Sequence, residues 1–435
     1  MLAIVALIFE LILLAVIKSS GVIQVSNLTA TILILIFSLC LLGSINSNKR
    51  LKGLYSQSLS YGYLLRVAIL YFDIFGQKIY TLPNTVGDAT VFYREASFRA
   101  EAITVGMTTL PGTRGNYPNM MARIFAIIGT NRLYGQFLSM LCSIVALVFF
   151  AYALSKTEIS DQTKKRIYRI LCLLPNYAIL STAFLREAVV CMFITLSVYC
   201  FLLWIYKKRN VYLLEAMLLV FPATYFHSGS IAVLVGYIVL LMIYDNNSRT
   251  IHIKANNAAL AVLAFAFAAF FLSSRQGTFL GKFGTIDSLE DIANTYEGGR
   301  TSYTRYVGNS NNPLNIIIFT IPRIFFFLLS PLPWMWSSFG DIIAFLFSSV
   351  FYLVTIVRVL KYLKVKDGKN RFLVVVLFVI ALGTTFVFAW GTSNGGTAAR
   401  HRDKMVTLYG LLLALCSDQV ADSRAPKRRK WSYTG

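Results

Sequence analysis

Charged residues are scarce in this sequence of 435 residues. Asp, Glu, Lys and Arg together make up 14% of the chain, whereas 57% of it is hydrophobic. A soluble globular protein is about a quarter charged and about half apolar. The shortage of charge, together with a mean hydropathy of +0.64, excludes a soluble enzyme and a disordered chain. It predicts a protein that uses lipid as its solvent.

Cysteine and histidine are also rare, with six Cys and three His. All six cysteines lie in or beside apolar runs, and none has the spacing of metal ligands. We interpret them as packing residues and expect no disulfide framework, no metal site and no cofactor. The cysteines are Cys40, Cys142, Cys172, Cys191, Cys200 and Cys416.

Acidic residues are outnumbered, with 19 Asp and Glu against 41 Lys and Arg and a net charge of +22. In a soluble protein this balance would indicate a nucleic-acid partner. Cytoplasmic loops of membrane proteins accumulate Lys and Arg, however, and no basic stripe on a soluble fold is available here. We therefore expect membrane lipid as a partner and no nucleic acid.

Long apolar runs are what the sequence does contain. A transmembrane helix needs about 20 such residues. The first run carries Glu10 and lacks a basic segment before it, so we interpret it as a retained span, in which Glu10 is packed against a partner, and not as a signal peptide. The candidate runs are about 2–17, 22–43, 61–82, 134–154, 168–185, 187–206, 211–226, 229–244, 256–273, 314–336, 341–358, 372–391 and 404–417.

Basic clusters between these runs predict the orientation, because they mark the cytoplasmic side. All of them share one side if the N-terminus is cytoplasmic and the run 314–336 does not cross. That run contains Pro322, Pro331 and Pro333 and ends in two tryptophans, which favours a re-entrant or interfacial hairpin. The clusters lie at 49–52, 164–169, 207–209, 361–371 and 427–430.

The sequence thus predicts an all-α fold, a polytopic transmembrane helical bundle of about twelve spans in the cytoplasmic membrane. Residues 1–417 form a single transmembrane domain, and 418–435 form a basic cytoplasmic tail. Three segments face outward, at 83–133, 274–340 and 392–403. Within the first of them, 88–102 and 119–129 are expected to be interfacial helices on the outer face.

Arginine is concentrated on the outer side in this arrangement, against the positive-inside rule. Arginine presents a planar fork suited to bidentate phosphate contact, so we expect an anionic ligand there, most simply a lipid-linked phosphate or diphosphate. Pairing with the outer acids or with lipid headgroups is the alternative. The outer arginines are Arg94, Arg99, Arg114, Arg123, Arg132, Arg186, Arg275, Arg300, Arg305, Arg323, Arg400 and Arg402, against Lys18, Lys78, Lys282 and Lys404.

Two charged positions stand at the outer ends of predicted spans. Arg186 and Glu187 interrupt an apolar stretch, where a charge costs roughly 2.5–3.5 kcal/mol unless it meets water or a partner. They either face a wet ligand cavity or form an ion pair between helices. His227 lies where one span ends and the next begins, and it suits a general base acting on a sugar hydroxyl. A structural histidine in a helical hairpin is equally consistent.

The segment 392–402 combines two glycines with Arg400, His401 and Arg402 just before the last run. Glycines permit close backbone approach, and a helix N-terminus supplies free N–H groups and positive potential. We expect a phosphate cradle here, with a polar turn as the alternative. The spacing is not that of a Walker loop.

Several outer residues complete the candidate site. Arg300 and Arg305 could close over a diphosphate as a lid, or lie in a solvated loop. Arg323 is a charge inside the proline-rich run. Asp88 and Glu95, seven residues apart on one helical face, could serve as base or sugar-binding groups; the alternative for Asp88 is a role only as an N-cap.

These features together resemble the Wzy-type polysaccharide repeat-unit polymerases, which are polytopic membrane glycosyltransferases of bacterial O-antigen and capsule pathways. The stretches that carry the resemblance are short, although the architecture is similar over most of the chain. They are Arg186-Glu187, His227-Ser228, Pro331-Leu332-Pro333-Trp334 and Gly396-Thr397-Ala398-Ala399-Arg400-His401-Arg402.

The resemblance implies joining of undecaprenyl-diphosphate-linked oligosaccharide units at the outer leaflet of the bacterial inner membrane. No metal is required, because arginines stabilise the leaving diphosphate, and a chain-length-regulating co-polymerase is an expected partner. The resemblance assigns the stabilisation of the diphosphate to Arg186, Arg300, Arg323, Arg400 and Arg402. A related ligase group carries a histidine in a large outer loop, whereas His227 lies at a hairpin, so His401 is a second candidate.

Two other functions fit the same sequence. A polyprenyl-phosphate-dependent transferase that adds a single sugar often has an acid in its first outer loop, as Asp88 would be. A flippase for lipid-linked oligosaccharides would line a central cavity with charge. The one-sided charges and long outer segments disfavour the flippase.

Overall fold

The computed structural model describes residues 1–107, 115–245, 250–251, 301–307, 313–365 and 370–422. Helices account for nearly all regular structure in this part of the chain, so the all-α prediction is confirmed; the exception is a two-residue antiparallel strand pair in which Tyr244 faces Ile251. The first elements are α1 (Leu2–Ser19), α2 (Asn27–Ser47), α3 (Ser56–Phe75), α4 (Asp88–Thr104), α5 (Asn116–Ile128), α6 (Arg132–Lys156), α7 (Asp161–Leu173), α8 (Pro175–Thr182), α9 (Glu187–Lys207) and α10 (Val211–Phe226).

The remaining elements are again mostly helices. They are η1 (Ser228–Ser230), α11 (Ile231–Ile243), β1 (Tyr244–Asp245), β2 (Thr250–Ile251), α15 (Thr304–Val307), α16 (Pro313–Leu329), η3 (Pro333–Met335), α17 (Phe339–Ile343), the π-helical η4 (Ala344–Ser349), α18 (Val350–Leu363), α19 (Arg371–Trp390), α20 (Gly395–Asp403) and α21 (Val406–Asp422).

Seven helices in the described residues are long and apolar enough, by length and composition, to cross a membrane. They are α1, α2, α3, α6, α9, the continuous run 339–363 and α19; shorter apolar helices lie at 211–226, 228–241, 318–329 and 406–417. α9 and α6 are the most deeply buried of the seven, and they form the centre of the bundle. The fold is therefore that of a helical membrane protein.

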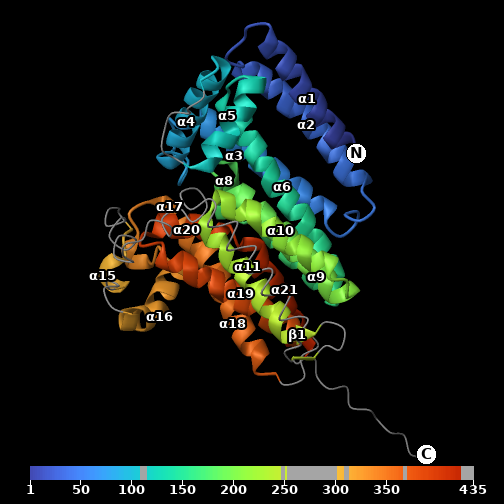
Figure 1. Cartoon of the computed structure of the whole chain (residues 1–435), viewed down its shortest axis with the longest axis vertical. Coiled ribbons are helices and arrows are strands. Elements are labelled where there is room, and N and C mark those ends of the chain that lie inside the picture. The colour runs from blue at the N-terminus through green and yellow to red at the C-terminus, as the bar shows by residue number, and fades with distance from the viewer. Residues whose placement is uncertain (108–114, 246–249, 252–300, 308–312, 366–369, 423–435) are drawn as a thin grey trace, which may run out of the picture.

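The long helices run side by side from the upper left to the lower right of the bundle (Figure 1). At one end, α4, α5, α17 and α20 lie together; we call this the α20 end. There the chain before α2 pairs with the chain before α6, through the bridge Gln24–Thr130 and the hydrogen bond from Asn131 to Asn27, 2.9 Å. The segments that lead into α2 and α6 therefore lie side by side at the α20 end.

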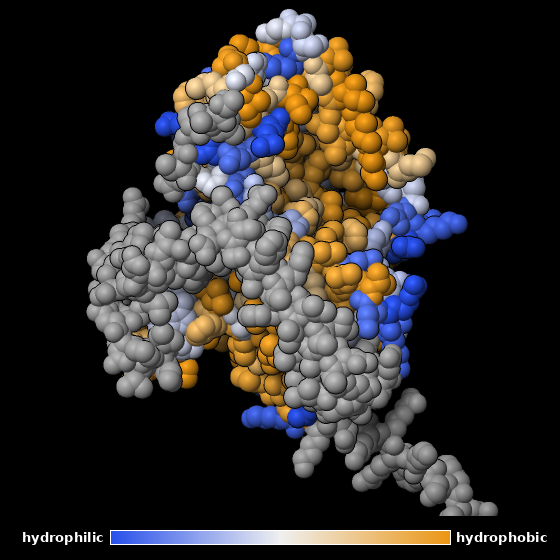
Figure 2. Space-filling model, in the orientation of Figure 1, coloured by the Kyte–Doolittle hydropathy of each residue, from blue (hydrophilic) through white to orange (hydrophobic). Residues whose placement is uncertain are grey.

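The opposite end, which we call the basic end, carries the α2–α3, α9–α10 and α18–α19 connections (Figure 1). Asn48 after α2 contacts Tyr152 near the end of α6 at 3.3 Å there. In Figure 2 hydrophobic residues cover the helices between the two ends, and hydrophilic residues gather at the ends. The basic clusters at 49–52, 207–209 and 361–365 therefore share one end, as the positive-inside argument requires.

Some predicted boundaries differ from the structure. The run 168–185 is not one helix, because Pro175 lacks an N–H and begins a separate helix, α8. Pro322, expected to break its helix, lies inside α16, and the chain turns later, at Pro331 and Pro333. α21 continues to Asp422, past the expected boundary at 417. The run 256–273 lies outside the described residues.

Candidate functional site

Four segments far apart in the sequence meet at the α20 end. They are the first turn of α4, the first turn of α9, the turn between α10 and η1, and α20 with the residues that follow it. α20 packs against α8, α9, α16 and α19, so it fills the space between the two halves of the bundle. The predicted helices 88–102 and 119–129 are present as α4 and α5, packed closely on each other.

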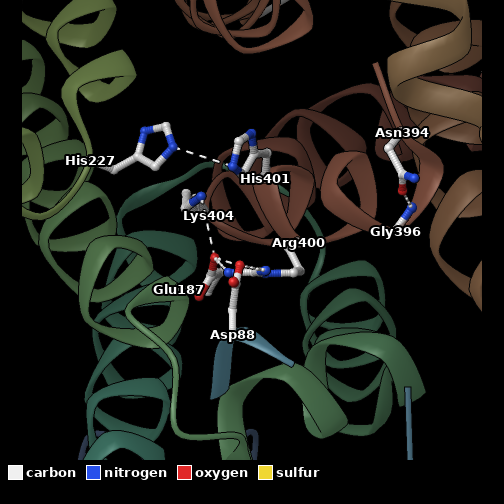
Figure 3. A network of polar contacts seen from close by, with 8 residues as sticks. All are labelled: Asp88, Glu187, His227, Asn394, Gly396, Arg400, His401 and Lys404. Atoms are coloured by element: carbon white, nitrogen blue, oxygen red, sulfur yellow. Dashed lines mark hydrogen bonds and ion pairs between the residues drawn. The ribbon is translucent and has the colours of Figure 1, made fainter. Parts of the chain in front are cut away.

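Arg400 lies between two carboxylates from different helices (Figure 3). Its guanidinium is 2.7 Å from Asp88 Oδ2 and 3.2 Å from Glu187 Oε1. The Asp88 side chain is 40% exposed, whereas that of Glu187 is 2% exposed. These acids raise the pKa of Arg400 above its ordinary value, against the effect of burial. Arg400 thus joins a rim acid, Asp88, to an interior acid, Glu187.

Lys404 brings a second basic group to Glu187. Its Nζ lies 3.6 Å from the same Glu187 oxygen, and its side chain is fully buried. Burial lowers the pKa of Lys404 well below its ordinary range, and Glu187 acts in the opposite direction. Arg186, directly before Glu187 in the chain, adds further positive potential at Lys404. Arg400, Lys404 and Arg186 thus bring three basic groups to the two carboxylates.

Two histidines stand beside this cluster. His227 Nε2 and His401 Nε2 are 3.3 Å apart, and His401 Nδ1 is 3.0 Å from the Thr392 hydroxyl. One ring must donate and the other accept in a single hydrogen bond between them. Burial, then the charge of Lys404, lowers the pKa of both rings well below 6.5. Each imidazole is therefore neutral near pH 7 and able to accept a proton.

A glycine in the turn after α10 makes this histidine pair possible. A Cβ on Gly229 would lie 2.3 Å from the ring of Phe388, so only glycine fits at that position. The same Phe388 ring lies 5.0 Å from the His227 ring and 5.7 Å from the His401 ring. Close approach at Gly229 thus brings the two imidazoles onto one aromatic surface.

Arg402, predicted to bind diphosphate, has a structural role instead. It is fully buried, and its guanidinium donates to the backbone carbonyls of Phe327 and Leu328 at the end of α16. Its own carbonyl accepts a 2.7 Å hydrogen bond from the Tyr352 hydroxyl. The carbonyls of Phe327 and Leu328 have no partner within their own helix end, so Arg402 satisfies them through Nη1, while its Nε and Nη2 are buried without a hydrogen-bond partner among the described residues.

Arg323 also lies within the protein interior. It is 2% exposed, and its guanidinium lies 4.3 Å from the ring centre of Trp390 on α19. This cation–π contact accounts for a charge inside the proline-containing helix. The diphosphate contact of Arg323 stays a prediction.

The glycines at 395–396 do not form the predicted phosphate cradle. Residues 395–403 make a helix of their own, α20, so Arg400 lies in its last turn and not beside its N-terminus. The Gly395 N–H donates to the Thr301 carbonyl, and that of Gly396 donates to Asn394 Oδ1 at 2.8 Å. Both donors are used by the protein itself, and Figure 3 shows Asn394 and Gly396 well apart from the acids.

The other predicted residues are dispersed. Glu95 is held by Arg99 at 2.7 Å and lies about 10 Å along α4 from Asp88, from the helical rise. Glu10 is buried and accepts from the Tyr134 hydroxyl at 3.2 Å, which confirms the expected partner. Arg300 and the side chain of Arg305 lie outside the described residues.

Sequence reasoning missed two members of the site. Lys404 was counted only as an outer lysine, although it directly follows the Arg-His-Arg segment. Asp403 is 1% exposed, accepts from Asn176 at 3.1 Å, and burial raises its pKa to about 7. No pattern linked Asn176 to this position. The run of five consecutive titratable residues at 400–404 was the available signal for both.

The fold and this one-sided cluster define a helical membrane protein with a polar site at one end of its bundle. Comparison with protein-family models, with curated proteins and with solved structures finds no match to this chain.

Proposed function

We propose that this protein is a polymerase that joins undecaprenyl-diphosphate-linked oligosaccharide units at the outer leaflet of the bacterial cytoplasmic membrane. The observation that carries the proposal is the charge cluster of Arg400, Lys404, Asp88 and Glu187 beside a neutral histidine pair. Its end of the bundle is opposite the basic connections, so the positive-inside rule assigns it to the outside. The bundle would comprise about twelve spans, with 314–336 as its outer hairpin.

A diphosphate can enter this cluster by replacing one contact. Asp88 is the exposed partner of Arg400, whereas Glu187 is buried. A phosphate oxygen that displaces Asp88 leaves Arg400 still oriented by Glu187, and Arg186 adds positive charge at the same place. Preorganised cations of this kind stabilise the charge that develops on a leaving group.

Bond formation then needs one base. The acceptor sugar hydroxyl attacks the anomeric carbon of the growing chain, the bond from that carbon to the diphosphate oxygen breaks, and the diphosphate leaves with the electron pair. A neutral imidazole, His401 or His227, takes the hydroxyl proton. The 3.3 Å contact between the rings lets that proton be shared with the second imidazole.

The test replaces cluster residues one at a time and scores the polymer ladder in cells. Arg186→Gln, Arg400→Gln and His401→Gln are expected to abolish the ladder while the protein still inserts. Arg94→Gln is the matched control, because Arg94 is an exposed arginine on the same helix as Asp88. A full ladder in all three cluster variants would refute the assignment.

The position of Asp88 favours one second candidate, a polyprenyl-phosphate-dependent transferase that adds a single sugar. Its 40% exposed carboxylate could act as the base in such an enzyme. Purified protein in detergent, supplied with lipid-linked units, separates the two functions: serial products of increasing length support the polymerase, and a single addition supports the transferase.

A further inference from the structure

A second polar cavity lies at the α20 end, separate from the charge cluster. It has a volume of about 460 Å³, within the range of roughly 300–1,000 Å³ that is typical of small-ligand sites. It is formed by the chain before α2, the end of α3, the middle of α4 and the start of α6. The residues that carry the argument are Gln24, Asn27, Gln77, Tyr93, Asn131 and Arg132.

Side-chain amides make up four of the ten residues that line this cavity. The Asn131 amide is used within the protein, since it donates to the Val25 carbonyl and to Asn27 and accepts from the Tyr134 N–H. The amides of Gln24, Asn27 and Gln77 contribute both donors and acceptors. Each hydroxyl group of a sugar can also donate and accept, so amides match it on both counts. Tyr93 supplies the only aromatic ring among the residues lining this cavity, and an aromatic ring suits the C–H face of a pyranose.

The one cation in the lining is already neutralised. Arg132 lies 3.5 Å from the buried carboxylate of Asp73 and donates to the Thr85 carbonyl at 3.0 Å. Asp73 in turn accepts from Gln136 at 2.7 Å and from Gln77 at 3.4 Å. With its charge balanced in this way, the cavity favours a neutral, hydroxyl-rich ligand over an anion.

Helix α4 connects the cavity with the charge cluster. Asp88 in its first turn binds Arg400, and Tyr93, five residues later, lines the cavity. The Tyr93 ring also packs edge-on against Phe184, 5.5 Å away, in the turn that leads to Arg186 and Glu187. Asp88 and Tyr93 are about 7.5 Å apart along the axis of α4, from the helical rise, so the two sites lie at neighbouring levels of one helix.

We infer that this amide-lined cavity is a binding site for a neutral stretch of glycan, distinct from the diphosphate cluster. The inference rests on the proposed function for its substrate class but on different residues. The site would hold one or two sugar residues of a lipid-linked unit or of the growing chain.

The test measures binding without catalysis. Purified protein in nanodiscs is titrated with oligosaccharides of one to three repeat units, cut from the surface polysaccharide of the cell that carries the gene. The double variant Gln24→Ala/Gln77→Ala and the variant Tyr93→Leu are expected to weaken binding at least tenfold. Gln57→Ala is the matched control, since Gln57 is an exposed glutamine at the other end of α3.

Each outcome decides the matter. Unchanged affinity in the cavity variants, or no binding by the unaltered protein, overturns the inference. The inference is also overturned if the cavity binds only a lipid headgroup. In that case the stability of the unaltered protein and of the cavity variants would respond differently to phosphatidylglycerol in the nanodisc, and neither would respond to the oligosaccharide. Thermal unfolding of each variant in the same nanodiscs checks that the fold is retained.

The proposed function fails separately. If the cavity variants lose glycan binding but the cluster variants leave the ladder unchanged, the cavity stands and the polymerase does not. If the ladder depends on Arg186 and His401 while glycan binding ignores Gln24, Gln77 and Tyr93, only the cavity inference is lost.

Discussion

Removal of the Glu187 charge is the most direct perturbation of the cluster. In Glu187→Gln, Lys404 loses the only carboxylate within ion-pair distance of it in the described residues, while Arg400 keeps Asp88. Breaking a buried ion pair by removing one partner costs about 3–5 kcal/mol. The cost is similar if Lys404 becomes neutral in the Glu187→Gln variant. Deprotonating a lysine with an unfolded-state pKa of about 10.4 costs about 4.6 kcal/mol at pH 7. We expect a loss of about 3–5 kcal/mol.

The loss should depend on pH in a direction that identifies Lys404. Burial lowers the pKa of Lys404 in the folded protein, so the unfolded chain binds more protons and stability rises with pH. Without Glu187 this effect is larger. The deficit of Glu187→Gln should therefore shrink between pH 7 and pH 9, by at most about 2.7 kcal/mol from the cost per pH unit.

The measurement is the free energy of unfolding in mixed micelles, titrated with SDS at both pH values. Adding Lys404→Met to Glu187→Gln removes the unpaired amine and should recover at least about 1 kcal/mol, a coupling of ordinary size for contacting residues. Glu215→Gln, an exposed glutamate on α10, should change little. Equal stability of the single and double variants, with no pH dependence, would refute the ion-pair argument.

Three further predictions follow from the same region. The stability of Asp403→Asn relative to the unaltered protein should increase as the pH rises from about 4 to about 7. Burial raises the pKa of Asp403 to about 7 in the folded state, so ionisation of this carboxyl destabilises the folded protein in that pH range. Equal dependence of stability on pH in the two proteins would contradict this. Polymer synthesis should show no decline near pH 6.5, since burial lowers the pKa of His227 and His401 well below that value; a decline of the ladder near pH 6.5 in the unaltered protein would contradict this. Arg402→Met should reduce the amount of folded protein, whereas Arg186→Gln should leave that amount intact and remove the ladder; immunoblots of both variants separate the two effects.

Apolar length and turn chemistry were enough to predict the helical class and the place of the longest helices. The runs at 134–154 and 187–206 became α6 and α9 because nearly every residue in them is apolar, and Asn131 provides the side-chain cap where α6 begins. The split at Pro175 was visible as a proline, but the same residue type at Pro322 is tolerated within α16. Whether a proline ends a helix depends on packing around it, which the sequence does not state.

The site could be predicted only in part, for a similar reason. Charges at the ends of apolar runs pointed to Arg186, Glu187, His227 and Arg400 correctly as residues of one end of the bundle. The sequence could not separate Arg400, held by two acids, from Arg402, bound to backbone carbonyls, because both lie in one short segment. Their different partners come from α4, α9 and α16, which only the folded chain brings to α20.

The alternation of Arg400 and Arg402 has a consequence for α20 as a moving part. A helix turns about 100° per residue, so these two side chains leave it in nearly opposite directions, one toward the acids and the other toward the end of α16. Rotation of α20 about its axis would pull both guanidinium groups out of register at once. α20 is therefore held on two sides. Any opening of this end of the bundle must move α20 together with α16, or break all contacts of either Arg400 or Arg402.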